Sequence, residues 1–157
     1  MNQLESWVEQ ISHWYETRKH DQDESLQSLI LSAPDSIWGP TITELQSKAI
    51  ACWLDGCLRI FHSLRYREPS VAYQYLQLAS SKLQACASHT QADIELKDWS
   101  MKRLQHLTVL ALEFCNQQHQ NDWQRESHQL IEAHVLFMAA QGWNEIRKHD
   151  QGSQPYH

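Results

Sequence analysis

Residues that break helices are almost absent from a long stretch in the middle of the chain. Between Pro40 and Gly142 there is one glycine, Gly56, and one proline, Pro69. Glycine and proline mark turns and interrupt helices, so a stretch that nearly lacks them has few tight turns. Apolar residues recur along it at helical spacing, in blocks too long for β-strands. The stretch therefore predicts a few long helices packed against one another.

Short polar segments divide this stretch into four predicted helices. We expect them at about 41–66, 70–87, 92–117 and 122–147. Thr41 and Glu44 have the spacing of a capping box, which marks the start of the first of these helices. Because short connections force neighbouring helices to run antiparallel, the predicted fold is all-α, an antiparallel four-helix bundle.

Two further helices are predicted before the bundle. An apolar stripe of helical period indicates one at about 3–19, and a shorter helix follows and ends at Pro34, since the residue before a proline is pushed out of helical geometry. We expect residues 1–147 to form a single helical domain. The polar residues 148–157 are predicted to form a flexible C-terminal tail.

Charge and hydropathy argue against two classes of partner. The net charge is −6, and no large cluster of basic residues supplies the electrostatic affinity that nucleic-acid binding needs. The apolar run 135–140 is far too short to span a bilayer, and the N-terminal sequence lacks the pattern of a secretory signal. We therefore expect a cytoplasmic protein without a membrane segment, and we disfavour a nucleic-acid partner.

The cysteines show none of the paired spacings of metal or redox motifs. Cys52, Cys57, Cys86 and Cys115 all fall within predicted helices, on or near their apolar sides. We interpret them as small buried side chains in a reducing compartment.

His134 is the most unusual side chain of the last predicted helix, because it lies near the centre of the apolar stripe. A buried imidazole is costly unless it is hydrogen-bonded. The interpretation we favour is a core histidine with a satisfied hydrogen bond. The alternative is a ligand, catalytic or partner-contact residue in a pocket between helices.

Carboxylate and imidazole side chains also alternate along one line of the first helix. Glu9, His13, Glu16 and His20 have spacings at which such groups can bind a transition metal. The line lies opposite the apolar stripe, so we interpret it as a solvated face and predict no metal site.

Motifs for catalysis or cofactor binding are missing. The sequence contains no Gly-rich phosphate loop, no GxSxG, no HExxH, no CxxCH and no Glu-x-x-His. We therefore name no catalytic, cofactor-binding or metal-binding residue, and the sequence favours a role other than enzymatic.

Several residues are candidate contacts with a partner. Ile37 and Trp38 lie in a loop bracketed by prolines, where an aromatic residue can anchor an interface or fold back onto the bundle. Three arginines near the end of the predicted helix 41–66 could form an anion site or a solvated helix end. Three apolar residues lie away from the main stripes, so they either pack against further helices or form a partner surface. The arginines are Arg59, Arg65 and Arg67, and the apolar residues are Leu136, Val109 and Tyr73.

The resulting hypothesis is a non-enzymatic cytoplasmic helical protein that acts through protein–protein interaction, as an adaptor, small chaperone or regulator. Its partner would be another protein or a second copy of itself, and a homodimer through helices 92–117 and 122–147 is one form. The alternative is a ligand-binding or catalytic bundle with an inter-helix pocket near His134. A weaker alternative is a nucleic-acid-associated regulator that uses Arg59, Arg65 and Arg67.

Overall fold

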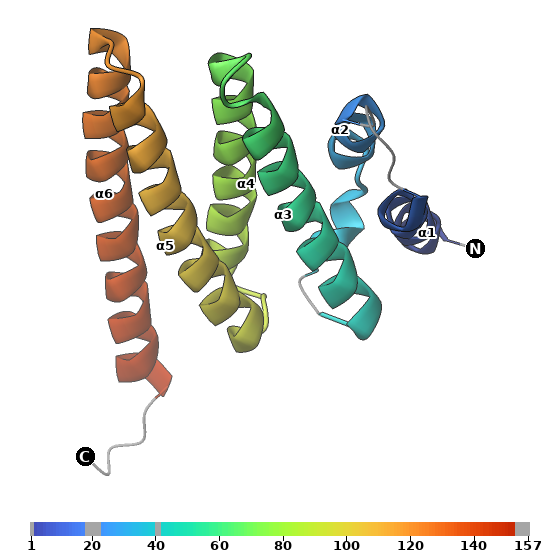
Figure 1. Ribbon diagram of the computed structural model, residues 1–157. Helices are drawn as coiled ribbons and strands as arrows, with labels where there is room; N and C mark the ends of the chain where they lie inside the picture. Colours follow the sequence, from blue (N-terminus) through green and yellow to red (C-terminus); the bar gives the residue numbers. More distant parts are fainter. Residues whose placement is uncertain (1, 18–22, 40–41, 153–157) are drawn as a thin grey trace. The chain divides into compact units, whose positions relative to one another are not determined.

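The structure of the chain is a computed structural model, which describes residues 2–17, 23–39 and 42–152, with side chains as far as Gly142 (Figure 1). All regular structure in these residues is helical. The elements are α1 (Gln3–Thr17), α2 (Asp23–Leu31), the 310 helix η1 (Asp35–Trp38), α3 (Glu44–Leu64), α4 (Pro69–Ser88), α5 (Ile94–Gln117) and α6 (Asn121–Gly152). The helices from α3 to α6 follow one another as antiparallel neighbours, and two α-helices precede them. The predicted fold class is confirmed.

The start of α3 corrects one sequence prediction. The capping box is formed by Thr43 and Gln46, two residues later than the predicted pair of Thr41 and Glu44. Thr43 Oγ1 accepts from Gln46 N at 3.2 Å, and Gln46 Oε1 accepts from Thr43 N at 3.0 Å. Gln46 Nε2 also donates to Ser36 O at 2.8 Å. Gln46 therefore both caps the start of α3 and connects it to η1.

The C-terminal boundary also differs from the prediction. Helix α6 continues to Gly152, so residues 148–152, which were predicted as part of a tail, are helical. Residues 153–157 lie outside the described residues, as do Thr41 and His20.

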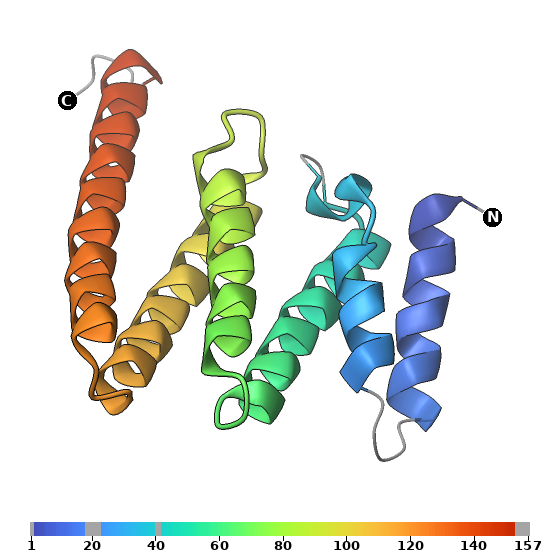
Figure 2. The ribbon, with the colours of Figure 1, turned by 90° about the horizontal axis from the view of Figure 1, so that it is seen from above.

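The chain divides into two compact units, Met1–Gln105 and His106–His157, with the division inside α5. Within the first unit α3 is the central element, because α1, α2, η1 and α4 all contact it. Figure 2 shows α3 between α2 and α4. Whether 1–147 behaves as a single domain stays a prediction.

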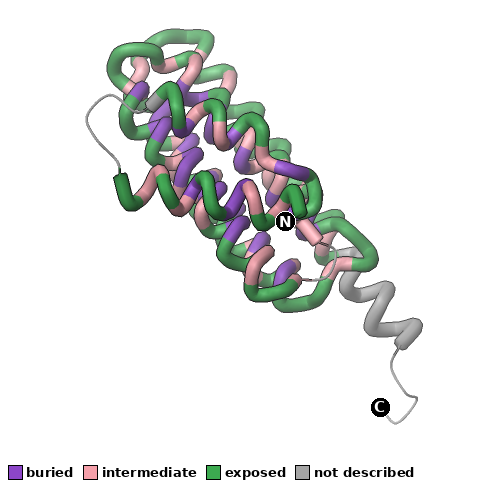
Figure 3. Tube along the Cα trace, turned by 90° about the vertical axis from the view of Figure 1, so that its right-hand side faces the viewer, coloured by how far each residue is buried: buried purple, intermediate pink, exposed green. Residues whose placement is uncertain are grey.

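Burial follows the predicted helical stripes most closely in α3 and α4. Buried and exposed positions alternate along the helices, as expected of amphipathic helices (Figure 3). The apolar residues that recur at helical spacing in these two helices are buried: Ile50, Trp53, Leu54, Cys57, Phe61, Leu64, Ala72, Leu76, Ala79, Leu83 and Cys86. Tyr73 is buried, which agrees with the alternative that it packs against another helix rather than forming a partner surface.

Two buried tryptophans hold the short helix α2 in place. The indole of Trp7 in α1 donates to Leu29 O at 2.8 Å, and that of Trp53 in α3 donates to Ile30 O at 3.0 Å. The last carbonyls of a helix have no partner within the helix. The two indoles satisfy two of them at the point where α2 is buried between its neighbours.

Candidate functional site

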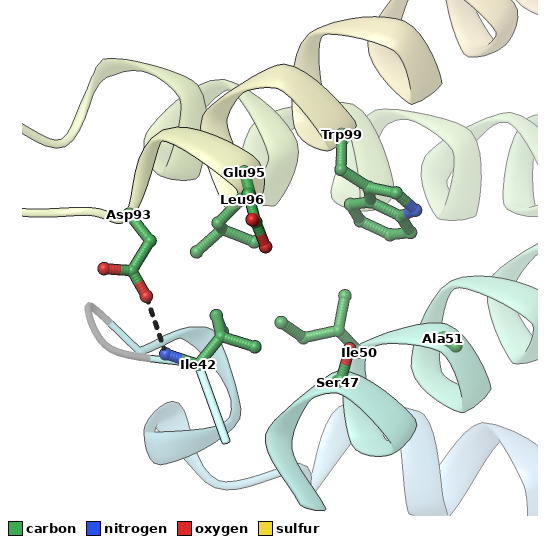
Figure 4. A pocket seen from close by; sticks show the side chains of 8 residues that line it. All are labelled: Ile42, Ser47, Ile50, Ala51, Asp93, Glu95, Leu96 and Trp99. Carbon is green, nitrogen blue, oxygen red and sulfur yellow. Dashed lines mark hydrogen bonds between the residues drawn. The ribbon is translucent and has the colours of Figure 1, made fainter. Parts of the chain in front are cut away.

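A pocket of about 300 Å³ lies between the N-terminal ends of α3 and α5, within the unit Met1–Gln105 (Figure 4). It is lined by residues from the segment before α3, from α3 itself and from the start of α5. These residues are Ile42, Ser47, Ile50, Ala51, Asp93, Glu95, Leu96 and Trp99. Figure 4 shows the α5 side chains facing those of α3 across the gap.

The pocket combines an apolar interior with carboxylates. Asp93 closes one end, where its Oδ2 accepts from Ile42 N at 3.2 Å. Asp93 also directly precedes α5, and its backbone O accepts a hydrogen bond from Lys97 N in the first turn at 3.0 Å. Glu95 is exposed in the first turn of α5, and Trp99 lies one turn further along the same side. The lining contains no lysine, arginine or histidine.

Trp99 already lies next to one cation. The guanidinium of Arg103 is over the indole, 5.5 Å from the ring centroid. The spacing of four residues from Glu95 to Trp99 and again to Arg103 places all three on one side of α5. The indole ring of Trp99 thus already makes a cation–π contact within the chain.

The sequence pattern did not predict this pocket. Two of its lining residues, Ile42 and Asp93, are far apart in the chain and are joined by a hydrogen bond. Neither belongs to a helical stripe. The one local signal was the pair of acids at the start of α5, which is also the ordinary charge preference of a helix N-terminus.

His134 is half-buried and does not line this pocket. Its Nδ1 lies 3.3 Å from Thr108 Oγ1 of α5, at hydrogen-bonding distance. The contact supplies the hydrogen bond of the favoured interpretation, but the half-buried side chain is not the core residue that this interpretation describes. A functional role for His134 stays an untested alternative.

Ile37 and Trp38 are folded back onto α3. Ile37 is fully buried in η1, and the Trp38 ring packs edge-on against Trp53, with 5.0 Å between ring centroids. In this conformation Ile37 offers no surface to a partner, and Trp38 is half-buried. Their position agrees with the alternative in which the aromatic residue folds back onto the bundle.

The three arginines have different surroundings. The Nε of Arg59 lies 2.6 Å from Asp55 Oδ2, and its guanidinium covers the Tyr15 ring. Arg65 stacks over Phe61, while Arg67 is exposed beyond the end of α3. The charge of Arg59 is therefore used within the fold, which weakens the case for an anion site.

Exposed apolar side chains gather on α6. Ile131 is 46% exposed and Val135, one turn later, is 59% exposed. Leu136 is 71% exposed on a different side of the same helix, and Val109 of α5 is also exposed.

Among the remaining candidates, Cys52 differs from its prediction, because it is half-buried rather than buried. Glu9, His13 and Glu16 are exposed, and no group of three potential metal ligands occurs among the described residues. The four cysteines are free thiols, of which Cys57, Cys86 and Cys115 are buried. Burial raises the pKa of the Cys86 thiol to about 11.

Comparisons with known proteins gave no match. No family model matches it, and neither a curated protein nor a solved structure is significantly similar to it. Among the described residues, no helix is both long and apolar enough to cross a membrane.

Proposed function

We propose that the chain is a non-enzymatic helical interaction module that acts through an exposed stripe of α6. The α6 stripe consists of residues spaced alternately by four and three positions: Gln124, His128, Ile131, Val135, Met138 and Gly142. This spacing averages 3.5 residues, the repeat with which two helices pack along a common seam. No member of the stripe is an acid, a lysine or an arginine.

The observation that carries the proposal is the exposure of Ile131 and Val135 at the centre of this stripe. Two large β-branched side chains, one turn apart on an uncharged helix face, lose unfavourable contact with water when another helix covers them. Interface cores are depleted of charged residues, as this stripe is. The arrangement supports docking of a helix, from another protein or from a second copy of this chain.

The second copy is the partner we test first, because one surface then supplies both halves of the interface. The homodimer is part of the proposal, as are the roles of adaptor, small chaperone or regulator. A cytoplasmic location is also part of it, supported by the four free thiols.

Sedimentation velocity over a range of protein concentrations tests the proposal. We expect reversible association that Val135→Glu weakens at least about tenfold, because the interface would bury an unpaired charge. The matched control is Leu136→Glu, which adds the same charge to the neighbouring exposed residue on another side of α6. This control should associate like the wild type.

Other outcomes would redirect or end the proposal. Loss of association in Leu136→Glu alone would move the interface to the other side of α6. If the wild type stays monomeric, affinity capture from its own cells is compared between the wild type and Val135→Glu. A protein held by both, or none held by either, would contradict a role for the α6 stripe.

A further inference from the structure

A pocket with carboxylates, an indole and no basic lining residue has a definite chemical preference. Its wall is formed by branched aliphatic side chains, Ile42, Ile50 and Leu96, which favour an apolar ligand body. Its volume of about 300 Å³ is at the lower end of the range for small-molecule sites. The space therefore suits a compact organic ligand rather than a nucleotide.

The charge of the lining selects the polar end of such a ligand. Glu95 is exposed and its carboxylate points into the gap between the two helices, as Figure 4 shows. Asp93 adds a second carboxylate, one oxygen of which accepts a hydrogen bond from Ile42 N. With two acids and no compensating cation in the lining, an anionic ligand is repelled and a cationic one is attracted.

Trp99 adds a second preference that is independent of the acids. An indole face attracts ammonium and guanidinium groups through its quadrupole, most strongly where water is partly excluded. The Arg103 guanidinium, 5.5 Å from the ring centroid, shows that a cation already lies over this ring. Acids alone at a helix N-terminus would only stabilise the helix, whereas the cavity and the indole provide a place for a ligand.

We propose that the pocket formed by Ile42, Ile50, Asp93, Glu95, Leu96 and Trp99 binds a small organic ammonium compound with an apolar body. The ammonium group lies between Glu95 and the Trp99 ring, and the apolar body lies against the aliphatic wall. This site is independent of the α6 stripe, since all of its residues belong to Met1–Gln105.

The test uses 2-phenylethylammonium as the probe, with 2-phenylethanol and 3-phenylpropionate as neutral and anionic analogues. Binding is followed on the full chain by NMR of the tryptophan indole N–H groups, with the Trp99 resonance assigned through Trp99→Phe. We expect saturable shifts of the Trp99 resonance at a Kd of about 1 mM or lower, with the neutral analogue roughly tenfold weaker. The anionic analogue should produce no saturable shift.

Two variants identify the site by charge. Glu95→Gln keeps the size of the side chain and should weaken binding of the ammonium probe roughly tenfold. Glu44→Gln is the matched control, because Glu44 is also an exposed acid in the first turn of its helix but does not line the pocket. This control should bind like the wild type.

The other results would overturn the proposal. Equal affinity for all three compounds would show an apolar cleft without charge preference. Equal weakening by Glu95→Gln and Glu44→Gln would show a general effect of net charge. Absence of a saturable shift at Trp99, with the chain folded, would show that the pocket does not hold this class of ligand.

Discussion

At Gly56, helix propensity and packing oppose each other. Glycine in the middle of a helix costs about 1 kcal/mol relative to alanine. A Cβ atom at this position would lie 2.5 Å from Ile30 Cδ1 and 3.4 Å from Leu26 Cδ1, both buried residues of α2. The glycine of α3 therefore provides the space in which α2 packs.

Gly142 gives the matched comparison, because a Cβ atom there meets nothing within 4 Å. We expect Gly142→Ala to raise the free energy of unfolding by about 0.5–1 kcal/mol. Gly56→Ala should instead lower it by about 1 kcal/mol, since the cost of overpacking exceeds the gain in propensity. Urea denaturation followed by circular dichroism measures both.

The Ile30→Val substitution tests the cause of this difference. It removes Cδ1, the atom nearest to the added methyl group. The double variant Ile30→Val, Gly56→Ala should be more stable than the sum of the single effects predicts, by about 1 kcal/mol. Equal stabilisation by Gly56→Ala and Gly142→Ala would mean that α2 does not approach α3 as closely as described.

Between elements, Tyr15 is the polar link from α1 to α3. Its hydroxyl donates to Asp55 Oδ2 at 2.5 Å and lies 3.3 Å from Cys52 O. Partial burial, followed by the hydrogen bond and charge of Asp55, raises the pKa of the Tyr15 hydroxyl well above its usual value of 10.0. Folding therefore favours the protonated phenol.

Tyr15→Phe should lower the free energy of unfolding by about 1–2 kcal/mol at neutral pH, because a hydrogen bond to a half-exposed carboxylate is lost. The raised pKa means that this contribution is present below pH 10 and decreases at higher pH, as the unfolded tyrosine begins to ionise. The difference in free energy of unfolding between wild type and Tyr15→Phe should thus be constant up to about pH 9 and shrink above pH 10.

Denaturation curves across this pH range check the linkage. Tyr66→Phe serves as the control, since Tyr66 is 85% exposed. This variant should match the wild type in stability at each pH. If the difference in free energy of unfolding between wild type and Tyr15→Phe stays unchanged above pH 10, the protonated Tyr15 hydroxyl does not stabilise the fold through Asp55.

The elements themselves differ in how far the sequence predicts them. The buried sides of α3 and α4 follow from the helical repeat, because each has one apolar side matched to the core. Tyr73 and Tyr75 of α4 are also buried, although neither belongs to the apolar positions of the repeat. The capping box was misplaced because Thr41 with Glu44 and Thr43 with Gln46 both have the required spacing. In the structure the later pair forms the box, and Gln46 also contacts η1.

The candidate pocket depends on information that no local pattern contains. It forms where the segment at Ile42 meets the start of α5, and one hydrogen bond from Ile42 N to Asp93 joins the two. The sequence pattern did not identify Glu95 or Trp99 as candidate site residues. Long-range packing decides such a site, while periodicity decides the helices that build it.

At the scale of the whole molecule, burial is unevenly distributed among the helices. In α3 and α4 a full side of each helix is buried, whereas Ser127 is the buried residue among the described side chains of α6. Regions with little buried apolar surface open locally at free energies below that of global unfolding. We therefore expect the amides of α6 to exchange with solvent faster than those of α3.

Protein concentration separates a weakly packed α6 from one that awaits a partner. If a second copy covers the α6 stripe, mass action stabilises the closed state, and exchange of the α6 amides slows as concentration rises. Hydrogen exchange read by mass spectrometry should show this slowing in α6 and none in α3. In Val135→Glu the α6 amides should exchange rapidly at every concentration, because the charged side chain prevents docking. Protection in α6 that equals that of α3 in dilute protein would mean that the helix is stable without a partner, and the exposed Ile131 and Val135 would then need another explanation.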